Sequence, residues 1–294
     1  MLCPVHIAIA LVTGLVNPFS LTRHLCSILG IRFLKTKVAR RSTTARARAD
    51  PPAAALQTSK PLADASKMRV VYLCNHRSWA DFFIDQVVTG GSSYLARLMV
   101  WIGTPVSSLY AWLSHSTWFF NRKRGIDRAA FAKFMDTEWA RRPTFGMIAY
   151  PEGTRNQDKD PLPLKTGVLQ FAFEYKRPVQ CVITAGKESV CNEKKLTARL
   201  AQTVVTECSA VIDPAAFDTQ DKFVAEVRKA FAETWKLAYG AKSEDCVAYE
   251  PPMDVPHPTF QSACEPAKVK TMRIATVIIA LVAAALPFYR RRFV

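Results

Sequence analysis

Short apolar runs of strand length alternate with longer amphipathic stretches of helix length between residues 67 and 240. The expected strands lie at 70–74, 117–121, 145–150 and 179–184, and the expected helices at 79–88, 105–115, 127–141, 166–176 and 218–240. Asp218 is the expected N-cap of the last helix. Alternation of buried strands with helices is typical of an α/β domain. The pattern therefore predicts an α/β fold with a mixed sheet flanked by helices.

The two ends of the chain differ from this domain in charge. The formal net charge is +16, yet residues 1–48 and 268–294 together hold 14 of the 40 Lys and Arg residues and no Asp or Glu. Residues 49–267 hold the other 26 basic residues against 24 acidic ones, so the body of the protein is nearly neutral. Basic residues beside apolar segments are typical of attachment to anionic lipid. A nucleic-acid binder would instead carry its charge on the folded domain.

Apolar segments occupy both ends. Residues 2–21 carry no formal charge, and residues 274–289 are a second uncharged stretch of sixteen residues. A helix of that length reaches about 24 Å, and flanking arginines can snorkel to cover the rest of a ~30 Å hydrocarbon core. The sequence predicts an N-terminal membrane-associated segment at 1–34, a basic linker at 35–66, a globular domain at 67–240, a polar tether at 241–267 and a C-terminal transmembrane helix at 268–294.

The eight cysteines contain no Cys-x-x-Cys pair, and none lies near a histidine at zinc-ligand spacing. Unpaired thiols are typical of a reducing compartment, which places the main domain on the cytosolic side. The sequence predicts no metal site.

The segment Asn-His-Arg-Ser-Trp-Ala-Asp at residues 75–81 follows an expected strand and opens an expected helix. Acyl transfer to an alcohol needs a base that is active near neutral pH, and an imidazole fits this requirement. A carboxylate can orient that imidazole and stabilise its charged form. If the helix begins at Ser78, His76 lies in the preceding turn and can fold back toward Asp81. The alternative for Asp81 is a capping box with Ser78.

Three further polar segments follow expected strands or precede a helix. Residues 119–124 are a strand end that runs into three cations, beginning with Arg122. Residues 150–155 read Tyr-Pro-Glu-Gly-Thr-Arg, in which Gly153 allows a close backbone approach and Arg155 offers a planar fork suited to phosphate. Lys165 stands before a helix, where it can bind phosphate at the helix N-terminus. For each segment the alternative is an ordinary turn with solvated or paired charges.

Together these segments resemble the motifs of the lysophosphatidic acid (1-acyl-sn-glycerol-3-phosphate) acyltransferase family of glycerolipid acyltransferases. That family carries Asn-His-x-x-x-x-Asp, Phe-x-x-Arg and Phe/Tyr-Pro-Glu-Gly-Thr-Arg in this order, which residues 75–81, 119–122 and 150–155 match. The resemblance covers about residues 70–185. It departs at Asn121, where many members carry Asp. It implies the following site residues: His76 as the base, Asp81 as its orienting partner, and Arg122, Glu152, Gly153, Thr154 and Arg155 around the phosphorylated acceptor.

The resemblance implies an enzyme that uses acyl-CoA as co-substrate, needs no cofactor and acylates lysophosphatidic acid to phosphatidic acid in phospholipid biosynthesis. Its expected place is a membrane, that of the endoplasmic reticulum, with the catalytic domain facing the cytosol. Two alternatives stay open: another lysophospholipid or glycerol 3-phosphate as acceptor, and a catalytically inactive membrane-anchored lipid-binding protein. A serine hydrolase is disfavoured because no Gly-x-Ser-x-Gly segment is present.

Overall fold

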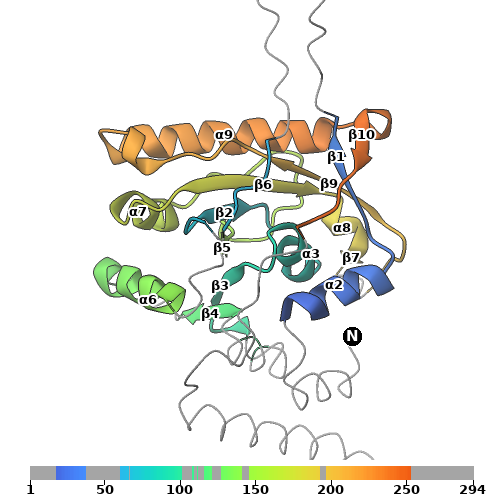
Figure 1. The fold of residues 1–294 in the computed structure, drawn as a ribbon, viewed down its shortest axis with the longest axis horizontal. Coiled ribbons are helices and arrows are strands. Elements are labelled where there is room, and N and C mark those ends of the chain that lie inside the picture. The colour runs from blue at the N-terminus through green and yellow to red at the C-terminus, as the bar shows by residue number, and fades with distance from the viewer. Residues whose placement is uncertain are drawn as a thin grey trace, which may run out of the picture.

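The computed structural model describes residues 18–37, 60–65, 67–100, 108, 111, 116–120, 127–140, 146–192 and 197–252. These residues form an eight-stranded sheet in the order β10-β1-β9-β6-β2-β5-β3-β4 (Figure 1). The strands are β1 Arg32–Thr36, β2 Val71–Cys74, β3 Ser93–Arg97, β4 Thr117–Phe120, β5 Met147–Ala149, β6 Val179–Ala185, β9 Thr203–Cys208 and β10 Cys246–Ala248. A separate ladder joins β7 (Cys191–Asn192) to β8 (Thr197–Ala198).

The sheet is mixed, as the sequence predicts. β6, β2, β5, β3 and β4 are parallel to one another. β9 pairs antiparallel with β6, β1 lies parallel to β9, and β10 is antiparallel to β1. The four expected strands are confirmed within one or two residues at each end, whereas β3 and β9 are additional strands that the periodicity did not indicate.

Helices cover both faces of the sheet (Figure 1). They are α2 Pro18–Ile28, α3 Asp81–Val88, α6 Arg128–Ala140, α7 Gly167–Glu174, α8 Lys187–Val190 and α9 Gln220–Gly240, with short 3₁₀ turns at Pro214–Ala216 and Ser243–Asp245. Residues of α6, α7 and α9 belong to one hydrophobic cluster, and residues of α2, α3 and α8 to the other. This is the layered arrangement typical of α/β domains.

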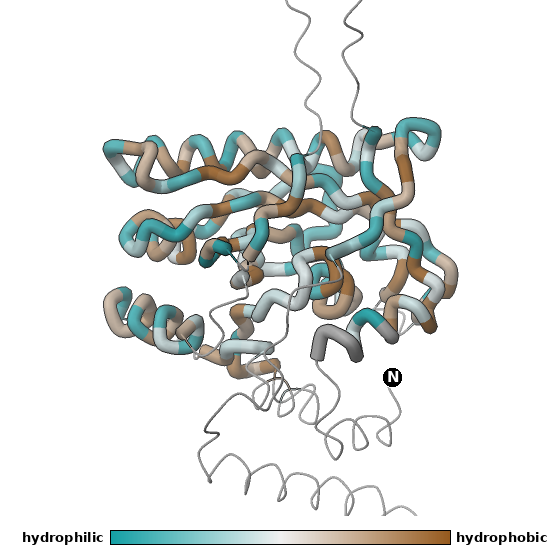
Figure 2. Tube along the Cα trace, viewed as in Figure 1, coloured by the Kyte–Doolittle hydropathy of each residue, from teal (hydrophilic) through white to brown (hydrophobic). Residues whose placement is uncertain are grey.

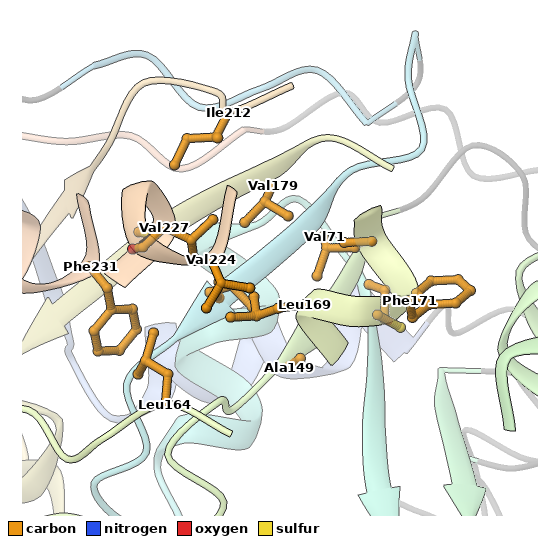
Figure 3. Close-up of a cluster of buried hydrophobic side chains, with 14 of the residues drawn as sticks. Val71, Ala149, Leu164, Leu169, Phe171, Val179, Ile212, Val224, Val227 and Phe231 are labelled. Carbon is orange, nitrogen blue, oxygen red and sulfur yellow. Dashed lines mark hydrogen bonds between the residues drawn. The ribbon is translucent and has the colours of Figure 1, made fainter. Parts of the chain in front are cut away.

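The alternation of side chains along a strand divides the core. Val71 and Leu73 of β2 belong to the cluster under α6, α7 and α9, whereas Tyr72 and Cys74 belong to the cluster under α2 and α3. Figure 3 shows Val71, Leu169 of α7 and Val224 of α9 in the first cluster, with Leu169 beside Val224. All four β2 residues are fully buried, because both faces of a central parallel strand are covered.

The last helix, α9, is amphipathic. Its buried face includes Phe223, Val227 and Phe231, and its hydropathy alternates along its length (Figure 2). The expected N-cap Asp218 is wrong by one residue: the Thr219 side chain accepts a hydrogen bond from Lys222 N. Asp218 instead forms an exposed ion pair with the Lys222 ammonium, 3.2 Å away.

The sheet extends beyond the expected domain boundaries at 67 and 240. β1 falls in the segments expected at a membrane and in a basic linker, yet it lies between β9 and β10. Residues 60–65 of the expected linker are also attached, because the buried amide of Gln180 accepts from Ala63 N and donates to the Pro61 carbonyl. β10 lies in the expected polar tether. Arg and Lys in β1 interrupt its apolar pattern, so only pairing with β9 shows it to be a strand.

Among the described residues, no helix combines the length and apolarity that crossing a bilayer requires. The expected transmembrane helix at 268–294 and the first half of the expected segment at 1–34, residues 1–17, lie outside the described residues.

Candidate active site

The loops that carry the sequence motifs meet at one edge of the sheet. β2 leads into residues 75–81 and β5 leads into residues 150–155, while β3 ends at Arg97 on the far side of β5. Because these strands are parallel, their carboxyl ends lie together, where open α/β sheets bind their ligands.

His76 and Asp81 form a close pair in the turn between β2 and α3. His76 Nδ1 lies 2.6 Å from Asp81 Oδ2. The same oxygen accepts from Arg77 N at 2.6 Å and from Ser78 N at 3.1 Å. The helix α3 begins at Asp81 with Ala80 as its N-cap and no side-chain cap bond, so Ser78 and Asp81 do not form the alternative capping box; the Asp81 carboxylate instead holds the loop around His76. Since Asp81 holds Nδ1, Nε2 is the nitrogen that can take a proton from an acceptor hydroxyl.

Tyr150, the first residue of the third motif, packs on the base. Its ring stacks on the His76 imidazole with centroids 4.3 Å apart and planes inclined by 19°. Burial raises the pKa of Tyr150 well above its usual range, so the phenol stays protonated. Its hydroxyl donates to Asp85 Oδ2 at 3.0 Å. The aromatic residue therefore fixes the plane of the imidazole and links it to α3.

Glu152 holds loops rather than facing a ligand. Its side chain is 2% exposed and accepts from three groups: His76 N at 3.3 Å, Asn156 Nδ2 at 2.7 Å and Leu162 N at 2.9 Å. A carboxylate with these contacts cannot also bind a phosphate, which it would repel. The geometry thus gives Glu152 a positioning role in place of the acceptor contact that the resemblance implies.

The remaining residues of the motif face the pocket described below. Gly153 has φ +73°, a left-handed conformation that favours glycine, and an added Cβ would lie 3.3 Å from Lys165 Cγ. Thr154, Arg155 and Lys165 are exposed at this edge. Lys165 N also donates to the Pro151 carbonyl at 2.7 Å, which joins the fourth segment to the third. Arg122 lies outside the described residues, two positions after the end of β4.

A pocket of about 690 Å³ opens beside His76. Its lining combines cations and one carboxylate, Glu174, with apolar side chains. The cations are Arg97, Arg128, Arg155 and Lys165. The apolar lining includes Met99, Phe120, Phe131, Met135, Val168 and Phe171. One cavity therefore offers a base, positive charge for an anion and an apolar surface for a hydrocarbon chain.

Comparison with known proteins identifies this arrangement. A family model described as Acyltransferase matches residues 54–185, the part of the chain that contains the His76–Asp81 pair and residues 150–155. Residues 54–185 are thus similar to acyltransferase domains. The resemblance to the lysophosphatidic acid acyltransferase family is thereby confirmed at the level of the family.

Two relatives accompany this match. The chain is 25% identical over 152 residues to a 1-acyl-sn-glycerol-3-phosphate acyltransferase of Cocos nucifera, covering 50% of this chain and 47% of the relative. It thus spans about half the length of that curated relative. The crystal structure of the 1-acyl-sn-glycerophosphate acyltransferase of Thermotoga maritima aligns with a TM-score of 0.48 and 18% identity, covering 60% of this chain and 68% of the other.

The region matched by the family model contains a cation that the sequence analysis did not single out. Arg97 ends β3 and donates to the Gly153 carbonyl at 3.0 Å. In the parallel pair of β3 with β4, Arg97 lies opposite Phe120 of the Phe-x-x-Arg segment. In the sequence, the only indication of a strand ending at Arg97 is the short run Tyr-Leu-Ala before it, which is too short to be distinguished from a loop.

Two buried charges beneath His76 were also missed. Asp85 lies one turn after Asp81 on α3, and Lys187 follows the carboxyl end of β6. Both side chains are inaccessible to solvent. The only signal for Lys187 was its place directly after Gly186 at a strand end, where a lysine is ordinarily a solvated residue.

Proposed function

We propose that the protein transfers a fatty acyl group from acyl-CoA to the free hydroxyl of lysophosphatidic acid, giving phosphatidic acid. The observation that carries this proposal is the His76–Asp81 pair at 2.6 Å, opening on a pocket that has both cationic and apolar lining residues. The match to the acyltransferase family supports the same reaction class.

The reaction needs one proton transfer in each direction. His76 Nε2 takes the proton of the acceptor hydroxyl as its oxygen attacks the thioester carbonyl carbon. The tetrahedral intermediate then collapses, the carbon–sulfur bond breaks and the CoA thiolate leaves with the proton that His76 returns. Asp81 stabilises the imidazolium formed between these steps. Positioned acid–base catalysis of this kind supplies about 10²–10⁴-fold in rate.

The charge of the pocket favours an acceptor with a phosphomonoester. Arg97, Arg155 and Lys165 line the same part of the pocket, where Arg97 donates to the Gly153 carbonyl, so this end of the site offers positive charge to an anionic headgroup. A phosphomonoester carries close to two negative charges and accepts bidentate bonds from arginine. Lysophosphatidic acid presents this group next to its free hydroxyl, and its acyl chain suits the apolar lining.

The proposed reaction takes place at a membrane surface. Both substrates are amphiphilic, and the apolar, basic ends of the chain would hold the domain at a lipid surface. The basic stretches next to the domain favour its cytosolic placement, on the endoplasmic reticulum or another internal membrane.

A direct assay tests the proposal. Full-length protein purified in detergent is given one labelled acyl-CoA and a panel of acceptors: lysophosphatidic acid, lysophosphatidylcholine and glycerol 3-phosphate. We expect labelled phosphatidic acid as the main product, and none with His76→Ala. Equal rates with lysophosphatidic acid and lysophosphatidylcholine would favour a broader lysophospholipid acyltransferase. Binding of lipid without transfer to any acceptor would favour an inactive lipid-binding protein.

A further inference from the structure

Lys187 is a fully buried lysine at the carboxyl end of β6, the strand next to β2. Gly186 precedes it with φ +90°, and a Cβ at this glycine would lie 2.8 Å from the Thr203 carbonyl. The turn that only glycine accepts here directs the Lys187 side chain inward, beneath the loop that carries His76. A buried ammonium is costly unless it is paired and hydrogen-bonded, so its partners define what it does.

The ammonium of Lys187 bridges the two carboxylates of α3. Nζ donates to Asp85 at 2.9 Å and 2.8 Å and to the Asn75 carbonyl at 2.7 Å, and it lies 3.4 Å from Asp81 Oδ1. Oδ1 of Asp81 is buried and accepts no hydrogen bond from the described residues. Lys187 therefore faces the oxygen of Asp81 opposite the one that holds His76.

The charges of this cluster are mutually dependent. Burial alone would raise the pKa of Asp81, but the Lys187 ammonium and the bond to His76 hold it below its usual range. Burial raises the pKa of Asp85 to about 7, against the lowering effect of Lys187. The titratable groups that face Lys187 or Asp85 are Asp81, Cys74 on β2, Tyr94 on β3, Tyr150 after β5 and Tyr239 on α9.

We propose that Lys187 is a positioning residue for the acyl transfer, which keeps Asp81 ionised and aimed at His76 Nδ1 from behind. This inference rests on the proposed function. Asp85 holds the ammonium in place, and through Tyr150 it also connects to the ring stacked on His76. Three strand ends thus support one imidazole: β2 through the motif itself, β5 through Tyr150 and β6 through Lys187.

The decisive variant removes both members of the buried pair. Lys187→Met alone leaves Asp85 without a cation and can prevent folding. Lys187→Met combined with Asp85→Asn removes one positive and one negative charge, so the net charge of the cluster is unchanged. The amide oxygen that replaces the Asp85 carboxylate can still accept the hydrogen bond from the Tyr150 hydroxyl. Lys222→Met, the same substitution at an exposed lysine of α9, is the matched control. Thermal unfolding of all variants shows whether they are folded.

We expect the folded double variant to lose about tenfold or more in kcat, part of the ~10²–10⁴-fold of acid–base catalysis. KM for both substrates should change less than about twofold, since Lys187 touches neither pocket nor substrate. The Lys187 ammonium is the main group that lowers the pKa of Asp81, so its loss raises this pKa by more than loss of the Asp85 carboxylate lowers it, and Asp81 is protonated earlier as pH falls. The acidic limb of the kcat profile should therefore move to higher pH. In an Asp81→Asn background the same double substitution should cause little further loss.

Three outcomes are distinct. The changes above, with Lys222→Met unchanged, support the inference. A folded double variant with wild-type kcat and pH profile, or a loss that is fully additive with Asp81→Asn, overturns it and gives Lys187 a structural role only. A wild-type protein that transfers acyl groups to no acceptor overturns the proposed function, and the positioning role with it.

Discussion

The ring of Tyr150 stacks on the imidazole of His76 with centroids 4.3 Å apart, while the Tyr150 hydroxyl donates to Asp85 at 3.0 Å. Tyr150, the first residue of the third motif, therefore packs directly against His76, the base of the first motif. Contact between these two loops explains why a loop after β5 matters to chemistry performed by a loop after β2.

Substitutions at Tyr150 separate the ring from the hydroxyl. Tyr150→Phe keeps the stacking and loses one hydrogen bond, worth ~0.5–1.5 kcal/mol, so we expect kcat to fall about two- to tenfold. Tyr150→Ala also removes the stacked ring and should cost clearly more. Steady-state kinetics of both folded variants measures the difference. Equal losses in the two would show that only the hydroxyl matters.

The base itself gives the largest effect. We expect His76→Ala to lose about 10²–10⁴-fold in kcat, because it removes the base. The variant should still fold, because His76 belongs to neither hydrophobic cluster, and thermal unfolding measures what the lost contacts with Tyr150 and Asp81 cost in stability. Asp81→Asn should also slow the reaction strongly, because an amide cannot stabilise the imidazolium. Near-normal turnover of purified His76→Ala protein would contradict the mechanism.

The pocket cations should affect one substrate only. Arg97→Ala and Arg155→Ala each remove a charge from the loop at Gly153, and a hydrogen bond to a charged group is worth ~1.5–3 kcal/mol. We expect KM for lysophosphatidic acid to rise roughly tenfold and KM for acyl-CoA to change little. Lys222→Ala, an exposed cation on α9, is the control. A parallel rise of both constants would place these arginines at the CoA phosphates instead.

Glu152 should matter for stability more than for substrate binding. Both oxygens of its carboxylate accept hydrogen bonds from N–H donors of the protein. In Glu152→Gln the NH₂ group must replace one of these oxygens, so at least one N–H donor faces another donor and loses its hydrogen bond. We expect the free energy of unfolding to fall by about 1–3 kcal/mol, measured by denaturant titration. KM for lysophosphatidic acid should change little in the folded fraction. A selective rise of that KM without destabilisation would restore Glu152 to the acceptor site.

The C-terminal segment is expected to attach the protein rather than to catalyse. Removal of residues 268–294 should weaken membrane association, assayed by flotation on anionic vesicles, and leave transfer in detergent nearly intact. Full release of the complete protein by carbonate would show that neither apolar end is inserted in the bilayer.

The sequence by itself determined the features that depend on neighbours along the chain. His76 and Asp81 are five positions apart, and a strand end followed by a helix start leaves a turn in which they can meet. The strand at 71–74 was likewise predictable, because burial on both faces gives it a continuous apolar run, and the strand at 179–185 follows the same pattern apart from the buried polar residues Gln180 and Thr184.

Only the tertiary structure decided the contacts made across the sheet. Lys187 and Asp85 are 102 residues apart, and their pairing follows from the adjacency of β6 and β2, which no local pattern specifies. The inward turn of Glu152 and the approach of Arg97 to Gly153 depend in the same way on β5 lying between β2 and β3. β1 was not predicted, because its charged residues interrupt the alternation of apolar and polar side chains that marks a strand. Its backbone hydrogen bonds with β9, a strand about 170 residues later in the chain, make it part of the sheet.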